Sequence, residues 1–216
     1  MKLNKLESLT NAIVDDLSPV TPVPDRRKLL LLWTMITVIF VPLSIILSGP
    51  LRHGYVDQIS NHPLFLLEVI SAFLISPLAA FLAMKLMVPG ELPNNSRRVL
   101  IPVGLLLLYF GWLVMRIFNP SIPPSSEGSR PHCSLEIFAF SLLPMISLLY
   151  FLSKGAVMRP KITGILVGIA GTIPSAAFMY ISCRYDPTHI ILFHFFPVLM
   201  MAIGGRFYLT WCHRSR

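Results

Sequence analysis

Six long apolar stretches constrain the fold of this chain more than any other feature. They cover residues 29–48, 64–84, 99–118, 134–153, 162–183 and 189–211. A helix of about 20 apolar residues crosses the hydrocarbon core of a bilayer. No water in that core can bond the backbone, so each stretch must be a helix. With 54% hydrophobic and 13% charged residues, the chain is predicted to be an all-α, polytopic bundle of six transmembrane helices over residues 29–216.

The basic residues predict how this bundle is oriented. If the amino terminus is cytoplasmic, 14 of the 18 Lys and Arg residues fall on the cytoplasmic side. The four that fall outside are Arg52, Arg116, Arg130 and Arg184. Short cytoplasmic loops of membrane proteins carry an excess of Lys and Arg. We therefore predict that both termini are cytoplasmic, and we attribute the net charge of +8 to this orientation rather than to direct nucleic-acid binding.

Residues 1–28 form a separate unit ahead of the first span, with an apolar stripe at helical spacing. The stripe consists of Leu3, Leu6, Leu9, Ile13 and Leu17. An isolated helix of about 15 residues is marginal in water, so this predicted amphipathic cytoplasmic helix needs a surface to bury against. Either the lipid headgroups or the groove of a protein partner would serve. A Pro-rich link follows the stripe, and prolines make such a link a semi-rigid spacer.

Ionisable and thiol side chains gather toward the predicted outer ends of the spans. Cys133 and Cys183 both fall at that boundary, near His132, Glu136, Asp186 and His189. Such an arrangement is compatible with incidental structural cysteines, with a disulfide in the oxidising exterior, or with a transition-metal ion held by thiolates. The neighbouring polar residues could support the two cysteines, although neither cysteine lies in a specific metal-binding motif.

Other polar and small residues inside the spans have structural interpretations. Glu68 and Glu136 need partners, for which Arg116, Arg184 or a nearby hydroxyl would serve. The fifth stretch contains three closely spaced glycines, which predict close helix packing rather than a nucleotide loop. These are Gly164, Gly168 and Gly171.

Several classes of function are disfavoured by the pattern. The chain has no phosphate-binding glycine loop, zinc-protease helix or nucleophile elbow, so we do not expect an enzyme. A thiol oxidoreductase would want a CxxC pair, which is also absent. A small metal transporter or permease is the main alternative to regulation. It would use the outer Cys, His and Glu layer for entry, but it would also need polar groups at mid-depth.

Three segments resemble the NrsF family of membrane-bound anti-sigma factors, which are negative regulators of extracytoplasmic-function (ECF) sigma factors. They are Leu-Ser-Pro-Val-Thr-Pro-Val-Pro at 17–24, Arg-Pro-His-Cys-Ser-Leu-Glu at 130–136, and Cys183 followed by Asp186. The resemblance extends over nearly the whole chain and includes its six spans.

The resemblance implies a location, a partner and a trigger. The protein is expected in the bacterial inner membrane, with its amino-terminal segment bound to an ECF sigma factor. Cys133 and Cys183 correspond to the two outer cysteines of the family, which would sense heavy-metal or oxidative stress and release the sigma factor. Whether the trigger is metal binding, thiol oxidation or both is left open by the resemblance.

Overall fold

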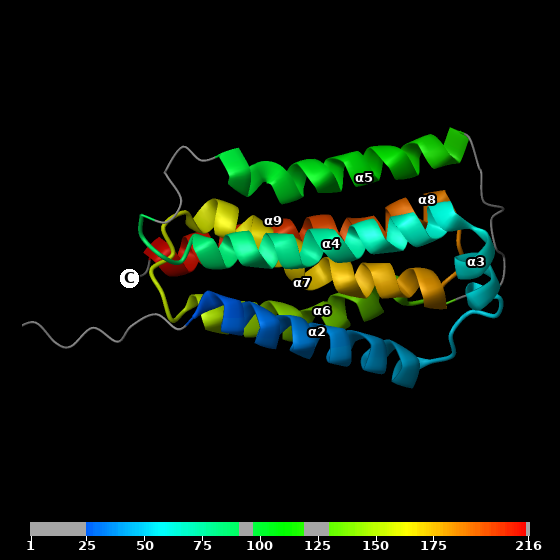
Figure 1. Cartoon of the computed structure of the whole chain (residues 1–216), viewed down its shortest axis with the longest axis horizontal. Coiled ribbons are helices and arrows are strands. Elements are labelled where there is room, and N and C mark those ends of the chain that lie inside the picture. Colours follow the sequence, from blue (N-terminus) through cyan, green and yellow to red (C-terminus); the bar gives the residue numbers. More distant parts are fainter. Residues whose placement is uncertain (1–24, 91–96, 119–129, 215–216) are drawn as a thin grey trace, which may run out of the picture.

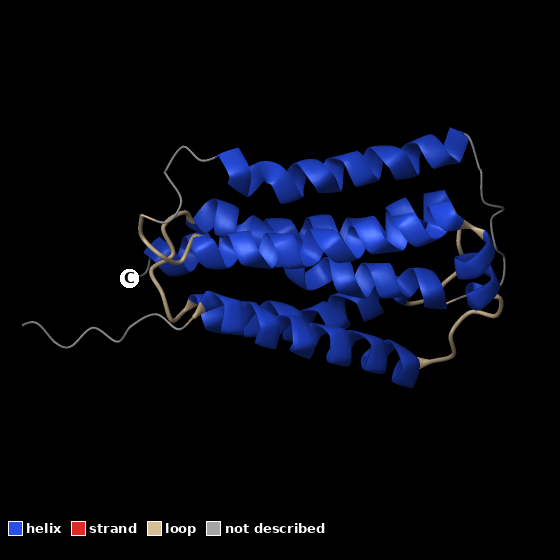
Figure 2. Ribbon diagram, in the orientation of Figure 1, coloured by secondary structure: helices blue, strands red, loops and turns tan. Residues whose placement is uncertain are grey.

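The computed structural model describes residues 25–90, 97–118 and 130–214 (Figure 1). The predicted amino-terminal helix and its apolar stripe therefore lie outside the described residues. Helices joined by loops make up the described part of the chain, with no strand among these residues (Figure 2).

The prediction of six membrane-spanning helices is confirmed, because six helices among the described residues are long and apolar enough to cross a bilayer. The first five are α2 (Arg26–Ser48), α4 (Pro63–Lys85), α5 (Ile101–Phe118), α6 (Cys133–Leu152) and α7 (Pro160–Ser182). The sixth span comprises α8 (Pro187–His189), η2 (Ile190–Phe195) and α9 (Phe196–Arg214). Two short elements lie between spans, namely α3 (Tyr55–Asn61) and η1 (Arg97–Leu100).

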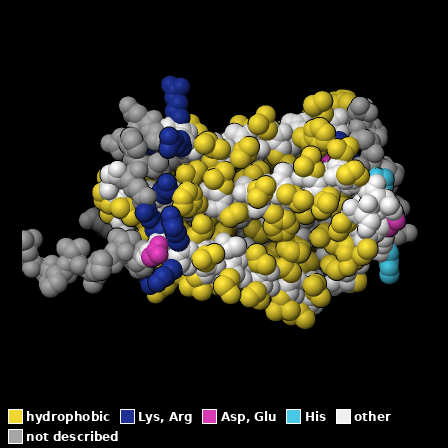
Figure 3. All heavy atoms as spheres, viewed as in Figure 1, with side chains coloured by type: hydrophobic (Ala, Val, Ile, Leu, Met, Phe, Trp, Pro, Cys, Tyr) yellow, Lys and Arg dark blue, Asp and Glu magenta, His cyan; other side chains and the backbone are white. Residues whose placement is uncertain are grey.

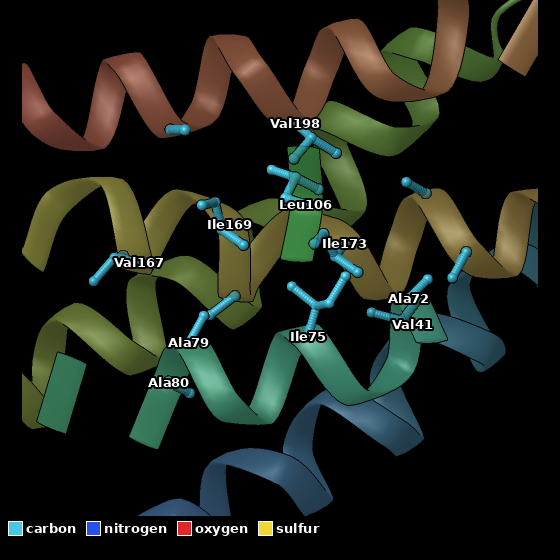
Figure 4. Packing of buried hydrophobic residues seen from close by; sticks show 14 of the residues in the cluster. Val41, Ala72, Ile75, Ala79, Ala80, Leu106, Val167, Ile169, Ile173 and Val198 are labelled. Atoms are coloured by element: carbon cyan, nitrogen blue, oxygen red, sulfur yellow. The ribbon is translucent and has the colours of Figure 1, made fainter. Parts of the chain in front are cut away.

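Helix α7 is the centre of the bundle. It is mostly buried and packs against α9, α4, α6 and α2. Figure 4 shows Ile169 and Ile173 of α7 near Ile75 of α4 and Val198 of α9, all of them buried. Helix α5 lies at the edge of the bundle, mainly beside α4 (Figure 1). The apolar outer faces of the peripheral helices are left for lipid.

Glycines let α7 approach its neighbours closely. A Cβ on Gly164 would lie 2.2 Å from the carbonyl oxygen of Gly205 in α9, and one on Gly168 would lie 2.3 Å from that of Met201. A Cβ on Gly171 would lie 2.4 Å from Met145 Cγ of α6. Small residues permit such backbone contacts between membrane helices. The close packing predicted from the sequence is confirmed.

The two ends of the bundle differ in chemistry. Lys and Arg gather at the end where α2 begins (Figure 3), which we call the basic end. It includes Arg27 and Lys28 of α2, Lys85 of α4 and the link between α6 and α7. The opposite end, where α6 begins at Cys133 and α7 ends beside Cys183, is called the cysteine end.

Candidate functional site

Four side chains converge at the cysteine end, and we call them the thiol–imidazole cluster: Cys133, Cys183, His189 and His194. One sulfur or ring nitrogen from each lies within 4.8 Å of all the others. The Nε2 atom of His189 is 3.0 Å from the sulfur of Cys183 and 3.6 Å from that of Cys133. Both cysteines are free thiols, and these two and His194 are buried, whereas His189 is half-buried.

The turn between α7 and the sixth span places His189 beside Cys183. Cys183 caps the end of helix α7, and its backbone N–H donates to the Met179 carbonyl. Asp186 then caps α8 by accepting from the N–H of Thr188 at 3.1 Å, and Pro187 occupies the first helical position. A capping carboxylate and an initial proline are typical of a helix start. The chain therefore reverses at once, and His189 returns to the level of Cys183.

A π-helical turn brings the second histidine to the same place. Residues five apart on an α-helix lie about 140° apart around its axis, because one turn takes 3.6 residues. In η2 the bonding is π-helical, which pairs residues i and i+5. The rings of His189 and His194 consequently lie 5.3 Å apart, centroid to centroid.

A hydrogen bond from α6 joins Cys133 to this turn. Pro197 has no N–H and cannot bond the carbonyl of Phe193, as an α-helix would require. The Ser134 hydroxyl of α6 donates to that carbonyl at 2.8 Å instead. Because Ser134 follows Cys133, this contact fixes the beginning of α6 against η2 and holds the Cys133 sulfur near both histidines.

The other predicted supporting residues lie outside the cluster. Glu136 accepts from Arg130 at 2.7 Å, and Asp186 caps α8 and pairs with Arg184 at 3.7 Å. His132 is exposed. The structure thus brings together the two predicted cysteines and His189, and it adds His194. The sequence did not predict His194 as part of the site, because residues five apart lie on the same side of a helix only where the turn is π-helical.

The predicted partner-binding residues lie in the part of the chain that the structure does not describe. These are Leu3, Leu6, Leu9, Ile13 and Leu17.

Beside the cluster, Arg130 joins the end of α2 to the beginning of α6, and we call this set of contacts the Arg130 clamp. Its guanidinium is bonded to Glu136 of α6, to a hydroxyl and to three carbonyls at the end of α2. These acceptors are Ser48 Oγ at 2.8 Å, Ile45 O at 3.0 Å, Gly49 O at 2.7 Å and Pro50 O at 3.1 Å. Cys133 lies three residues away and donates its N–H to the Arg130 carbonyl at 3.4 Å.

A second buried network includes Glu68 of α4. Its carboxylate accepts from the Tyr185 hydroxyl and from the Trp112 indole, each at 3.0 Å, and lies 3.4 Å from Arg116 Nε of α5. Arg116 also donates to the Tyr185 hydroxyl at 3.1 Å. Of the partners that the sequence left open for Glu68, Arg116 and a hydroxyl are the ones that the structure places beside it. Tyr185 follows Cys183 by two residues, so this network fixes the turn between α7 and α8. Burial raises the pKa of the Tyr185 hydroxyl.

The thiol–imidazole cluster offers two kinds of chemistry. Contact with the Cys133 thiol, and then with His189, lowers the pKa of Cys183, although burial acts in the opposite direction. A thiolate is the reactive form of cysteine toward both oxidants and metal ions. The cluster therefore places a reactive sulfur beside a second sulfur, with a ring nitrogen of each of two imidazoles within 4.8 Å of both.

Comparison with known families identifies the kind of protein that carries this cluster. The sequence pattern of NrsF, described as negative regulator of sigma F, matches residues 13–214. The chain belongs to the NrsF family. Curated proteins and solved structures gave no match. Membership of NrsF makes the chain a membrane-embedded negative regulator with a sigma factor as its partner, and the matched residues include the whole thiol–imidazole cluster.

Proposed function

We propose that this NrsF protein is an anti-sigma factor of the bacterial inner membrane. Residues 1–28 hold an ECF sigma factor in the cytoplasm, and residues 29–216 anchor the complex in the bilayer. Reaction of Cys133 and Cys183 with a heavy metal or an oxidant at the outer face releases the sigma factor. The main support is the pairing of the two cysteines at the end of the bundle opposite the start of α2.

The contacts between α2 and α6 give this proposal a physical route. Helix α2 follows directly on residues 1–25 at the basic end. At the cysteine end the Arg130 clamp joins α2 to α6, and deeper in the bundle the Trp33 indole of α2 donates to the Pro144 carbonyl of α6 at 2.8 Å. A displacement of α6 at Cys133 therefore displaces α2 as well. Residues 1–28 then change their position relative to the membrane and to the bound sigma factor.

The coupling free energy that this mechanism needs is small. A tenfold change in affinity for the sigma factor corresponds to about 1.4 kcal/mol. Coupling between distinct sites is typically about 1–3 kcal/mol. Joining two sulfurs, or binding a metal ion between them, is a change large enough to supply that amount.

Copurification of the sigma factor with the full-length protein tests the proposal. Wild-type protein should retain the sigma factor in unstressed cells and lose it after cadmium or peroxide treatment. The Cys133→Ser/Cys183→Ser variant should retain it under both conditions. Cys212→Ser is the matched control and should behave as wild type. Cys212 is the third cysteine of the chain and lies in α9 near the basic end.

A second variant tests the docking segment in the same experiment. Leu9→Asp/Ile13→Asp places charges in the apolar stripe, so it should lose the sigma factor without stress while still inserting into the membrane. Retention of the sigma factor by this variant would contradict docking through residues 1–28. Stress-induced release from the double-serine variant would contradict sensing by the two cysteines.

A further inference from the structure

We propose that the thiol–imidazole cluster is a four-ligand site for one divalent cation of the zinc and cadmium class. Cys133 and Cys183 would supply two thiolates, and His189 and His194 two neutral imidazoles. This inference deepens the proposed function by naming the chemical species that the cysteines bind. Only the regulatory role of the site, and not the site itself, rests on the proposed function.

The size of the cluster fits tetrahedral coordination. With metal–nitrogen bonds of about 2.0–2.1 Å and metal–sulfur bonds of about 2.3 Å, neighbouring ligand atoms of a zinc tetrahedron lie roughly 3.3–3.8 Å apart. Here the His189 nitrogen is 3.0 and 3.6 Å from the two sulfurs, and no pair exceeds 4.8 Å. Small side-chain shifts would therefore close the four atoms around one ion.

His194 is the observation that favours a cation over a disulfide. Its side chain is 1% exposed, and neither ring nitrogen has a hydrogen-bond partner among the described residues. A buried polar group without a partner costs about 1–3 kcal/mol. A disulfide would use only the two sulfurs and leave this imidazole unsatisfied. A cation at the centre of the cluster would accept a nitrogen lone pair from His194 and one from His189.

Charge balance favours a divalent ion in this buried position. On binding, each cysteine loses its thiol proton to solvent, so two protons leave and two sulfur–metal bonds form without any change of oxidation state. The product, M²⁺ with two thiolates and two neutral imidazoles, has no net charge. Burying an uncompensated charge is costly, and a monovalent ion with the same ligands would leave one negative charge. Two thiolates with two imidazoles are a ligand set of tetrahedral zinc.

The position of the site links binding to the helices. The four ligands come from the beginning of α6, the residue that caps the end of α7, and the α8–η2 turn of the sixth span. One ion would hold these three elements together next to the Arg130 clamp. His189 is the least buried of the four ligand residues.

Cadmium binding to the purified full-length protein in detergent, without any sigma factor, tests the site. We expect one Cd²⁺ per chain by elemental analysis, with thiolate-to-cadmium absorption in the ultraviolet. His194→Ala and His189→Ala should each weaken cadmium binding at least about tenfold. Loss of a residue that only hydrogen-bonds to a metal ligand already weakens metal binding by about that factor. His132→Ala, a change of an exposed histidine at the same end, should leave binding unchanged.

The visible spectrum of bound cobalt reports the coordination geometry of the site directly, independently of the binding affinity. Co²⁺-loaded wild-type protein should show the visible absorption of a tetrahedral ion, and His189→Ala should change that spectrum even if His194→Ala fails to fold. Absence of cadmium binding, or equal binding by the wild type and both histidine variants, would overturn the four-ligand site. Four-ligand binding without sigma-factor release would contradict only the proposed function. Release by stress, together with unaltered cadmium binding in both histidine variants, would overturn only the four-ligand site.

Discussion

Replacing Arg130 by Met removes the guanidinium of the Arg130 clamp and keeps most of the apolar volume of the side chain. The clamp is almost wholly inside the protein, with the Arg130 side chain 8% and that of Glu136 23% exposed. The substitution leaves the Glu136 carboxylate without its arginine and removes a donor from three carbonyls at the end of α2. Removing one partner of a buried ion pair costs about 3–5 kcal/mol. We expect the free energy of unfolding to fall by that amount.

Arg184→Met is the matched control, because Arg184 also lies at the cysteine end with a carboxylate partner. Its side chain is 48% exposed, and its nitrogen lies 3.7 Å from Asp186. Exposed pairs of this kind contribute about 0–1 kcal/mol. The assay is unfolding of both purified variants by denaturing detergent in mixed micelles, followed by circular dichroism.

Sigma-factor release provides a second readout for the same pair of variants. If α2 follows α6 through the clamp, Arg130→Met should blunt the release caused by cadmium while Arg184→Met responds as wild type. Equal losses of stability in Arg130→Met and Arg184→Met would refute the reasoning on the clamp. Full cadmium-induced release from a folded Arg130→Met protein would refute its role in transmission.

Two further predictions concern packing and buried charge. Gly205→Ala should lower the free energy of unfolding much more than Gly204→Ala does, measured by the same detergent titration. A Cβ on Gly205 would lie 2.3 Å from the Gly164 carbonyl oxygen, whereas one on Gly204 meets nothing within 4 Å. Equal effects of the two substitutions would contradict the α7–α9 contact. Glu68→Gln and Arg116→Met should each lower the free energy of unfolding by about 3–5 kcal/mol. The double variant should lose less than the sum of these two amounts, because it leaves no unpaired buried charge. Additive losses would contradict the ion pair.

The parts of the fold that periodicity and length determine could be predicted from the sequence. Six apolar stretches, each long enough for one span, left no competing assignment for the membrane helices. The spacing of Gly164 and Gly168 predicted close packing, because residues four apart share one face of a helix. The position of Gly205 as their counterpart on α9 could not be predicted, because the partner of a packing face depends on the order of helices in the bundle.

The site was predictable only in part, for a geometric reason. Cys133 and Cys183 could be placed at one boundary by counting residues along the spans. The proximity of His194 could not, because it depends on the π-turn, and the turn depends on Pro197 together with a hydroxyl from another helix. Likewise, the partner of Glu136 proved to be Arg130, six residues before it, and not Arg116, Arg184 or a hydroxyl as the sequence had suggested.

Membrane-impermeant thiol labelling most directly tests whether the signal must cross the bilayer. In a chain with serine at positions 133, 183 and 212, single cysteines would replace exposed His53, in the link that follows α2, or exposed Lys28, near the beginning of α2. An impermeant maleimide should label His53→Cys in intact spheroplasts and Lys28→Cys only after lysis. Labelling of both positions from the same side would contradict a thiol–imidazole cluster that faces away from the sigma factor.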